Sequence, residues 1–184
     1  AVVSGALPGG EARGLIVPLD GHWSPARGLA LWHECTDFRF DRLEMANLVL
    51  ERRGLRLCPP RTGPMLAYDA RGLRLAAGAP SLDLAGELAG TAIRLESGAV
   101  GFAWPGNLSA RDVNVALGPE SEASTFSISE VQATLGNAIE GTFADADVGL
   151  FAVPLDLRGT SGLWRYADGV FAIEQAGFVL EDRS

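Results

Sequence analysis

The chain has 184 residues, of which 47% are hydrophobic and 21% are charged, and its formal net charge is −8 at pH 7. This length is enough for one sizeable hydrophobic core. The acidic balance argues against nucleic-acid binding, which requires a basic patch. No stretch approaches the roughly 18 consecutive apolar residues of a membrane-spanning helix, so the apolar residues must serve another pattern.

That pattern is a short alternation of apolar and polar residues, which recurs along most of the chain. The pentapeptide Arg-Gly-Leu-Arg-Leu at 53–57 recurs at 71–75, and triplets such as Leu82-Asp83-Leu84 follow. Successive triplets are separated by about ten residues, a spacing typical of strands joined by short hairpins. Strict alternation of apolar and polar residues indicates strands with one dry face and one wet face.

We expect residues 1–30 to be an irregular N-terminal segment with one strand at 15–19, and residues 31–184 to form a repetitive antiparallel β domain. Residues 124–135 could also begin as a helix, because Ser127 and Glu130 have the spacing of a capping box, but their alternation favours a strand. The whole chain reads as a fragment of a longer protein. The further strands expected in chain order are 29–33, 38–40, 43–51, 55–58, 65–68, 73–76, 82–85, 93–96, 100–104, 113–117, 125–135, 148–157, 163–166, 170–174 and 178–180.

The predicted fold class is therefore all-β. We expect a long antiparallel meander of short strands, in which the sheet curls or twists into a groove or open barrel. The same apolar face could instead pack on itself and close the sheet as a sandwich. Cys58 begins a proline-rich stretch, 58–64, that must be a turn or a rigid loop because proline cannot donate to a ladder.

The two cysteines, Cys35 and Cys58, are 23 positions apart. They are either free buried thiols or a disulfide, which would stabilise the fold by roughly 3 kcal/mol and imply an oxidising compartment. His33 and Cys35 would point to the same face of a strand, with His22 nearby, but the usual ligand spacings of a closed zinc site are missing. We expect no metal and no cofactor.

Signatures of catalysis are also missing from the sequence. It contains no Gly-x-Ser-x-Gly, phosphate loop or dinucleotide fingerprint. Its carboxylates are scattered, so the paired acids of a glycosidase have no specific signal here. Exposed tryptophans could stack on sugars, but at strand positions they more often belong to a core. We predict that the protein is not an enzyme.

The stretch from about Cys35 to Asp182 resembles the YdbH branch of the AsmA-like bacterial envelope proteins, a relative of the TamB type. The likeness rests on Cys35 before the strand segment 38–43, on Leu55-Arg56-Leu57-Cys58-Pro59, on the short strands and glycine turns of 82–90, and on the segment 159–180. The likeness lies in the arrangement of short strands and turns, and its specific motif is the two-cysteine segment.

The resemblance implies a large protein of the Gram-negative envelope, anchored in the inner membrane and extending a β-rich body into the periplasm. Such a body would carry phospholipid or another acyl lipid along an apolar groove, and would reach the inner and outer membranes through flanking sequence. The alternatives are a structural or interaction module with a closed core, and a carbohydrate-binding β domain. The lipid-groove candidates are Leu73, Leu75, Leu82, Leu84, Ile93, Leu95, Phe102, Trp104, Val113 and Leu117.

Overall fold

The computed structural model describes residues 2–7, 10–45, 47–136, 138–167 and 170–182. Every regular element among them is a β-strand, and all the strands join one antiparallel sheet. The strands are β1 (Val2–Leu7), β2 (Gly10–Ile16), β3 (Gly21–Ser24), β4 (Gly28–Leu31), β5 (Thr36–Met45), β6 (Leu48–Leu57), β7 (Leu66–Asp69), β8 (Gly72–Ala79), β9 (Leu82–Leu88), β10 (Thr91–Ser97), β11 (Val100–Trp104), β12 (Gly106–Leu117), β13 (Ser124–Leu135), β14 (Ile139–Gly149), β15 (Leu155–Ala167) and β16 (Val170–Asp182).

Several of these strands are halves of longer strands that are interrupted by a bend. The pairing of β9 with β10 runs from Leu88–Thr91 to Leu82–Ser97, and the pairing of β8 with β11 continues it from Ala79–Val100 without any offset. β12 pairs with both β10 and β11 in one register. β12 therefore has three partner strands only because β10 and β11 are two halves of one bent strand, and the sheet is a simple meander.

The bends fall near the middle of the long strands and divide the sheet into two arms. Pro80-Ser81 separates β8 from β9, and Gly98-Ala99 separates β10 from β11. Beside them the amide of Gly98 donates to the carbonyl of Arg111, at 2.9 Å. In the longer strands a residue with positive φ lies at the bend, at Asp112, Asp145 and Gly159. The register between β14 and β15 also shifts near Asp145 and Gly159.

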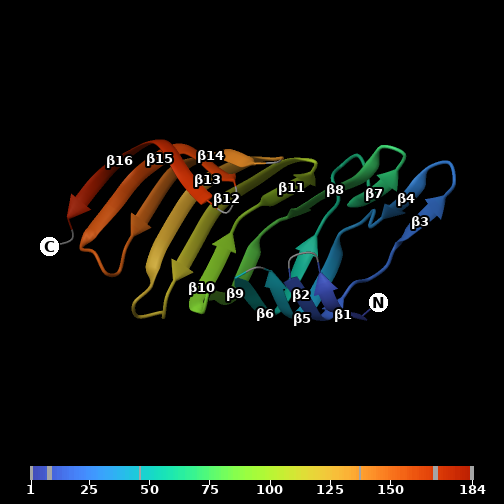
Figure 1. Ribbon diagram of the computed structural model, residues 1–184, viewed down its shortest axis with the longest axis horizontal. Helices are drawn as coiled ribbons and strands as arrows, with labels where there is room; N and C mark the ends of the chain where they lie inside the picture. The colour runs from blue at the N-terminus through green and yellow to red at the C-terminus, as the bar shows by residue number, and fades with distance from the viewer. Residues whose placement is uncertain (1, 8–9, 46, 137, 168–169, 183–184) are drawn as a thin grey trace.

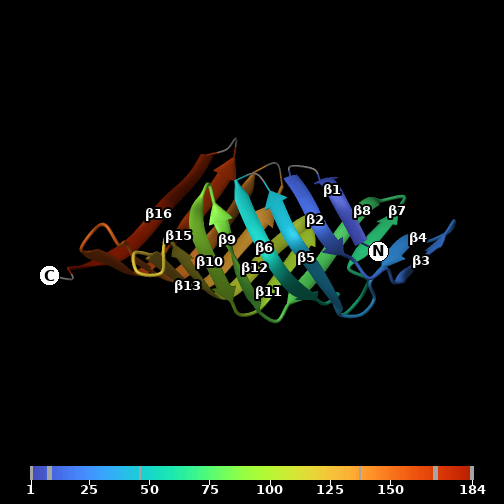
Figure 2. The same cartoon turned by 90° about the horizontal axis from the view of Figure 1, so that it is seen from below.

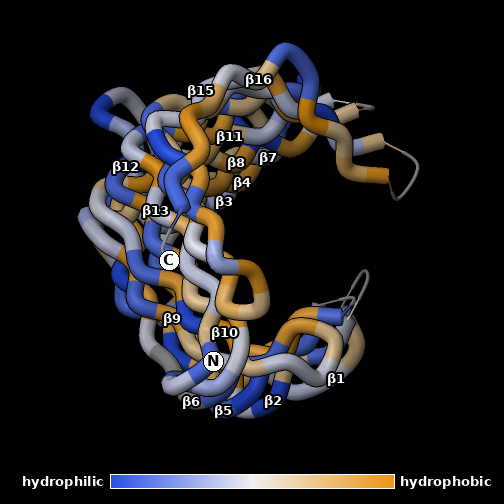
Figure 3. Tube along the Cα trace, turned by 90° about the vertical axis from the view of Figure 1, so that its left-hand side faces the viewer, coloured by the Kyte–Doolittle hydropathy of each residue, from blue (hydrophilic) through white to orange (hydrophobic). Residues whose placement is uncertain are grey.

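The bent strands give the molecule the shape of an elongated trough. Figure 1 shows the strands side by side along the long axis, and Figure 2 shows the same arrangement from below. Viewed along that axis, the sheet curves like the letter C, with β5, β6, β9 and β10 in one arm and β4, β7, β8 and β11 in the other (Figure 3). The sheet is not closed into a barrel, since β1 and β16 are unpaired along one edge within the described chain.

The all-β antiparallel fold is confirmed, but several predicted boundaries are wrong. Residues 2–24 contain three strands, β1 to β3, where we expected one at 15–19, because their short runs gain order by pairing within the sheet. The strand expected at 29–33 is present as β4. The strand expected at 43–51 is two strands that turn beside Asn47, a residue favoured in turns. The strand expected at 148–157 is interrupted by Pro154, which follows the end of β14.

Candidate functional site

One face of the sheet is apolar along nearly its whole length. Residues that are partners in an antiparallel ladder point to the same side. In the first arm such a row joins Leu43, Leu50, Gly86, Ile93 and Leu117. The cross-strand register thus assembles a continuous surface, called here the apolar face, from segments far apart in the sequence.

The ten groove candidates all have positions on the apolar face. The ladder pairs Leu84 with Leu95, Ile93 with Leu117 and Leu75 with Trp104. The other candidates follow from alternation within the same strands. The bends divide the set between the arms, with Leu82, Leu84, Ile93, Leu95, Val113 and Leu117 in the first arm and Leu73, Leu75, Phe102 and Trp104 in the second.

The apolar faces of the two arms look toward each other across the trough. Between β13 and β16 a cavity of about 400 Å³ is lined by Phe126, Ile128 and Val148 of the first arm and by Phe143, Trp164 and Ile173 of the second. Because one cavity contacts both arms, the apolar face is the concave face. No polar atom of the lining reaches the cavity surface.

These cavity residues were not among the candidates from the sequence. Alternation was visible in 125–135, but its phase changes between Ile128 and Val131, where the buried positions pass from even to odd numbers. The ladders of β13 with β12 and with β14 both lack a pair at this point, although neither register shifts. Following that change of phase would have placed 131 on the same face as 128.

The opposite face is polar and carries most of the ion pairs. Arg158 contacts Asp147 at 3.3 Å, Asp156 at 3.0 Å and Glu181 at 3.3 Å, and so joins β14, β15 and β16. A broad hollow on this face is lined by polar residues such as Ser109, Gln132 and Thr142. The trough thus keeps a wet outside and a dry inside.

The turn between β7 and β8 is held by a carboxylate. Asp69 accepts hydrogen bonds from the guanidinium of Arg74 and from the main-chain amide of Arg71, both at 2.8 Å. The Arg74 hydrogen bond is the largest of the effects that hold the pKa of Asp69 well below its usual range. The carboxylate of Asp69 therefore stays ionised at neutral and mildly acidic pH, and continues to accept the hydrogen bonds that hold the turn.

The apolar face is uncovered rather than packed. The solvent-accessible surface is 11773 Å², whereas a compact monomer of 19.3 kDa is expected to expose about 8,500 Å². Buried apolar residues are few and mostly small, among them Ala12, Ala133 and Ala146. The sheet therefore exposes much more apolar surface than a closed sandwich of the same mass would.

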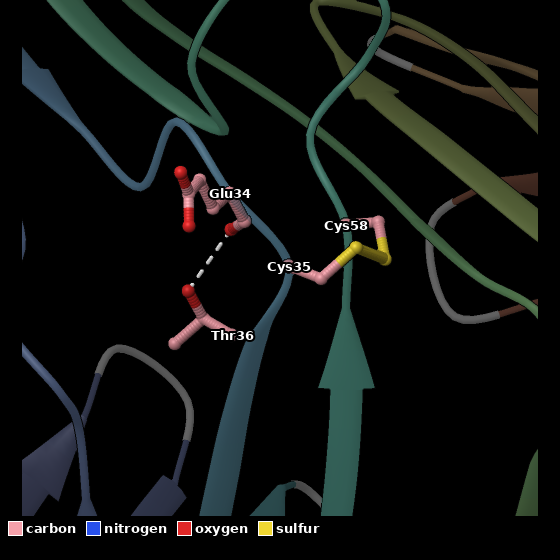
Figure 4. Close-up of a disulfide and its surroundings, with 4 residues drawn as sticks. All are labelled: Glu34, Cys35, Thr36 and Cys58. Carbon is pink, nitrogen blue, oxygen red and sulfur yellow. Dashed lines mark hydrogen bonds between the residues drawn. A yellow bond between two sulfur atoms is a disulfide. The ribbon is translucent and has the colours of Figure 1, made fainter.

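A disulfide fixes the corner between the arms. Cys35 and Cys58 are bonded, with an S–S distance of 2.03 Å, and the hydroxyl of Thr36 donates to the carbonyl of Glu34 beside them (Figure 4). Cys58 also exchanges main-chain hydrogen bonds with Gly78 of β8, at 2.8 and 2.9 Å. The covalent link thus ties β5 to the end of β6 where the sheet bends.

The candidate metal ligands His22, His33 and Cys35 do not form a metal site in the structure. Cys35 is a disulfide sulfur, so it does not offer a thiolate to a metal beside His33. The rings of His22 and His33 are stacked with centroids 5.3 Å apart. Within the described ranges no three His, Cys, Asp or Glu side chains cluster as metal ligands would.

Comparison with known families gives a match over residues 2–184, to the model described as YdbH-like, intermembrane phospholipid transport protein YdbH. The chain belongs to the YdbH-like family. Its match spans the trough from β1 to β16, so the apolar face lies wholly within a domain of this family. No curated protein and no solved structure matches the chain.

The family places the YdbH-like chain among proteins of phospholipid transport between membranes. That assignment agrees with the uncovered apolar face. Among the described residues there is no helix of the length and hydropathy needed to cross a membrane.

Proposed function

We propose that this chain is a non-enzymatic segment of a periplasmic lipid-transfer bridge, which carries phospholipid acyl chains along its apolar face. The observation that supports the proposal best is that the apolar faces of both arms line one cavity. Each acyl methylene that leaves water for such a surface gains roughly 0.8 kcal/mol. The phospholipid headgroup stays in water at the open side of the C.

The proposal requires no catalytic residue. Many similar apolar positions follow one another along the trough, so an acyl chain can move from one to the next without a chemical step. We propose further that the whole protein is anchored in the inner membrane of a Gram-negative bacterium and exchanges lipid with both membranes through its flanking sequence.

A matched pair of variants tests the proposal. Leu84→Asp places a carboxylate on the apolar face, whereas Ala85→Asp places one on the polar face opposite Arg94, its ladder partner. We expect Leu84→Asp to lower co-purified phospholipid by about tenfold or more, because a charge among acyl chains costs several kcal/mol. Ala85→Asp should retain the wild-type amount.

The measurement is native mass spectrometry with lipid extraction from a detergent-free preparation. Equal lipid content in the two variants would contradict the proposal. A wild-type chain that carries no lipid after incubation with liposomes, together with severe unfolding by Leu84→Asp, would instead indicate a closed structural module.

A further inference from the structure

The trough is not uniform along its length. Near its N-terminal end the exposure of the apolar face varies, since Ala12 is fully buried and Leu50 is 8% exposed, whereas Leu73 is 47% exposed. Toward the C-terminal end Phe171 and Ile173 remain 59% and 57% exposed, although they line the cavity between the arms. We call the part of the trough that encloses this cavity, between β13 and β16, the wide section.

Two glycine–aromatic pairs lie in the wall of the wide section. In the ladder of β14 and β15, Gly141 is the partner of Trp164, and Phe143 is the partner of Gly162. A Cβ atom at Gly141 would lie 2.8 Å from Nε1 of Trp164, and one at Gly162 would lie 3.2 Å from Cε1 of Phe143. Each ring therefore lies over the glycine of the neighbouring strand.

A ring that lies along the wall leaves the lumen free. A ring opposite a larger residue would have to stand away from the sheet, and would fill the space between the arms. The ring of Trp164 also stacks on Phe171 of β16, with centroids 5.8 Å apart and planes 26° apart. Trp164, Phe171 and Phe143 thus form an aromatic part of the wall of the wide section.

We propose that the wide section is a holding site for a phospholipid acyl chain, at which the chain rests longer than elsewhere along the trough. This inference rests on the proposed function, because it assumes that acyl chains enter the trough. Contacts from both arms surround the chain in the wide section, so more of its apolar surface leaves water there than on a single open face. The glycines act by positioning Trp164 and Phe143.

Tryptophan fluorescence distinguishes a holding site from a uniform trough. One variant retains Trp164 and has phenylalanine at 23, 32 and 104; the second retains Trp104 and has phenylalanine at 23, 32 and 164. Trp104 is on the same apolar face but outside the cavity lining, and is 42% exposed. The probe is a vesicle of phosphatidylcholine brominated in its acyl chains, which quenches tryptophans that contact them.

We expect Trp164 to be quenched at a several-fold lower lipid-to-protein ratio than Trp104. Quenching of both at the same ratio, or of Trp104 first, would overturn the holding site while leaving the lipid-transfer proposal in place. Quenching of neither would overturn both. Far-UV circular dichroism of the two variants establishes that each keeps its sheet.

A second pair of variants isolates the wide section itself. Ile173→Asp brings a carboxylate into the lining, and Ala172→Asp places the same charge on the opposite face beside Arg165, its ladder partner. In the Trp164 background, Ile173→Asp should remove the early quenching and Ala172→Asp should preserve it. If early quenching of Trp164 survives Ile173→Asp, the acyl chain does not rest there and the inference is wrong.

Discussion

Thr160 is a polar residue that is buried in the apolar lining of the concave face. Its side chain is only 7% exposed, and it belongs to the lining of the cavity. Its hydroxyl has no hydrogen-bond partner among the described atoms, and neither does the indole nitrogen of Trp164. A buried polar atom without a partner loses its hydration and gains nothing in return, so both atoms lower the stability of the fold.

The substitution Thr160→Val tests this reading of Thr160. Valine has nearly the same shape and a higher preference for strands, so the change removes the unpaired hydroxyl and leaves the packing in place. We expect the free energy of unfolding to rise by about 1 kcal/mol, measured by urea denaturation. A loss of stability of that size would mean that the hydroxyl has a partner in solution.

At the scale of the element, the long strands are shaped by their bulges. β15 bends at Gly159, which has a φ of 57°, and β14 bends beside it at Asp145, with a φ of 48°. The amide of Gly159 donates to the carboxylate of Asp147 at 3.0 Å, and the amide of Asp145 donates to the hydroxyl oxygen of Ser161 at 3.1 Å. These bends turn a flat ladder into a curved one.

Substitution of two glycines in the same region can distinguish the effect of backbone conformation from the effect of steric crowding by an added Cβ atom. A Cβ atom at Gly159 or at Gly177 would meet nothing within 4 Å, but only Gly159 has a positive φ. Gly159→Ala should therefore lower the free energy of unfolding by roughly 1–2 kcal/mol, whereas Gly177→Ala should be neutral or stabilise by about 0.5 kcal/mol. Thermal and urea unfolding of the two variants check this difference, and equal effects would show that the bend at Gly159 is not fixed.

At the scale of the whole molecule, the trough exposes an apolar face that water does not stabilise. Large apolar patches on a soluble chain usually mark a partner or a ligand. The disulfide and the ladder of the meander hold the shape of the trough, but they leave its concave side without cover. An occupant of that side should therefore contribute to the stability of the fold.

Removal of lipid should consequently lower the melting temperature. A ligand that binds only the folded chain at a free concentration of 100 times its Kd adds about 2.7 kcal/mol, which corresponds to a shift of about 5–10 °C for a chain of this size. Scanning calorimetry of delipidated protein, with and without added phosphatidylcholine, measures the shift. A melting temperature that does not respond to the lipid would argue that the apolar face has another occupant.

Much of the fold could be predicted from local pattern. The triplets around Leu84, Ile93 and Phe102 are strands as expected, because alternation is set by neighbours in the chain. Membership of the YdbH-like family was recognised through the two-cysteine segment and the style of the short strands. The strands β1 and β3 were missed because pairing across the sheet, rather than local propensity, orders them.

The repeated pentapeptide shows where prediction from local sequence ends and the effect of cross-strand partners begins. In its first copy Gly54 lies within β6, and in its second copy Gly72 begins β8 after a turn, with a φ of 97°. Identical residues thus have different conformations, since the partners of each copy differ.

The sequence by itself determined that the chain is a meander of strands with one apolar side, because both properties depend on residues that are adjacent or nearly so. Only the tertiary structure decided which apolar side chains face each other, that the sheet stays open, and where a cavity lies between the two arms. Those properties depend on the bends at Pro80, Gly98 and Asp112 and on the pairing of Gly141 with Trp164. A bulge shifts the phase of alternation, and a cross-strand partner fixes the position of a ring, so neither can be read from one strand alone.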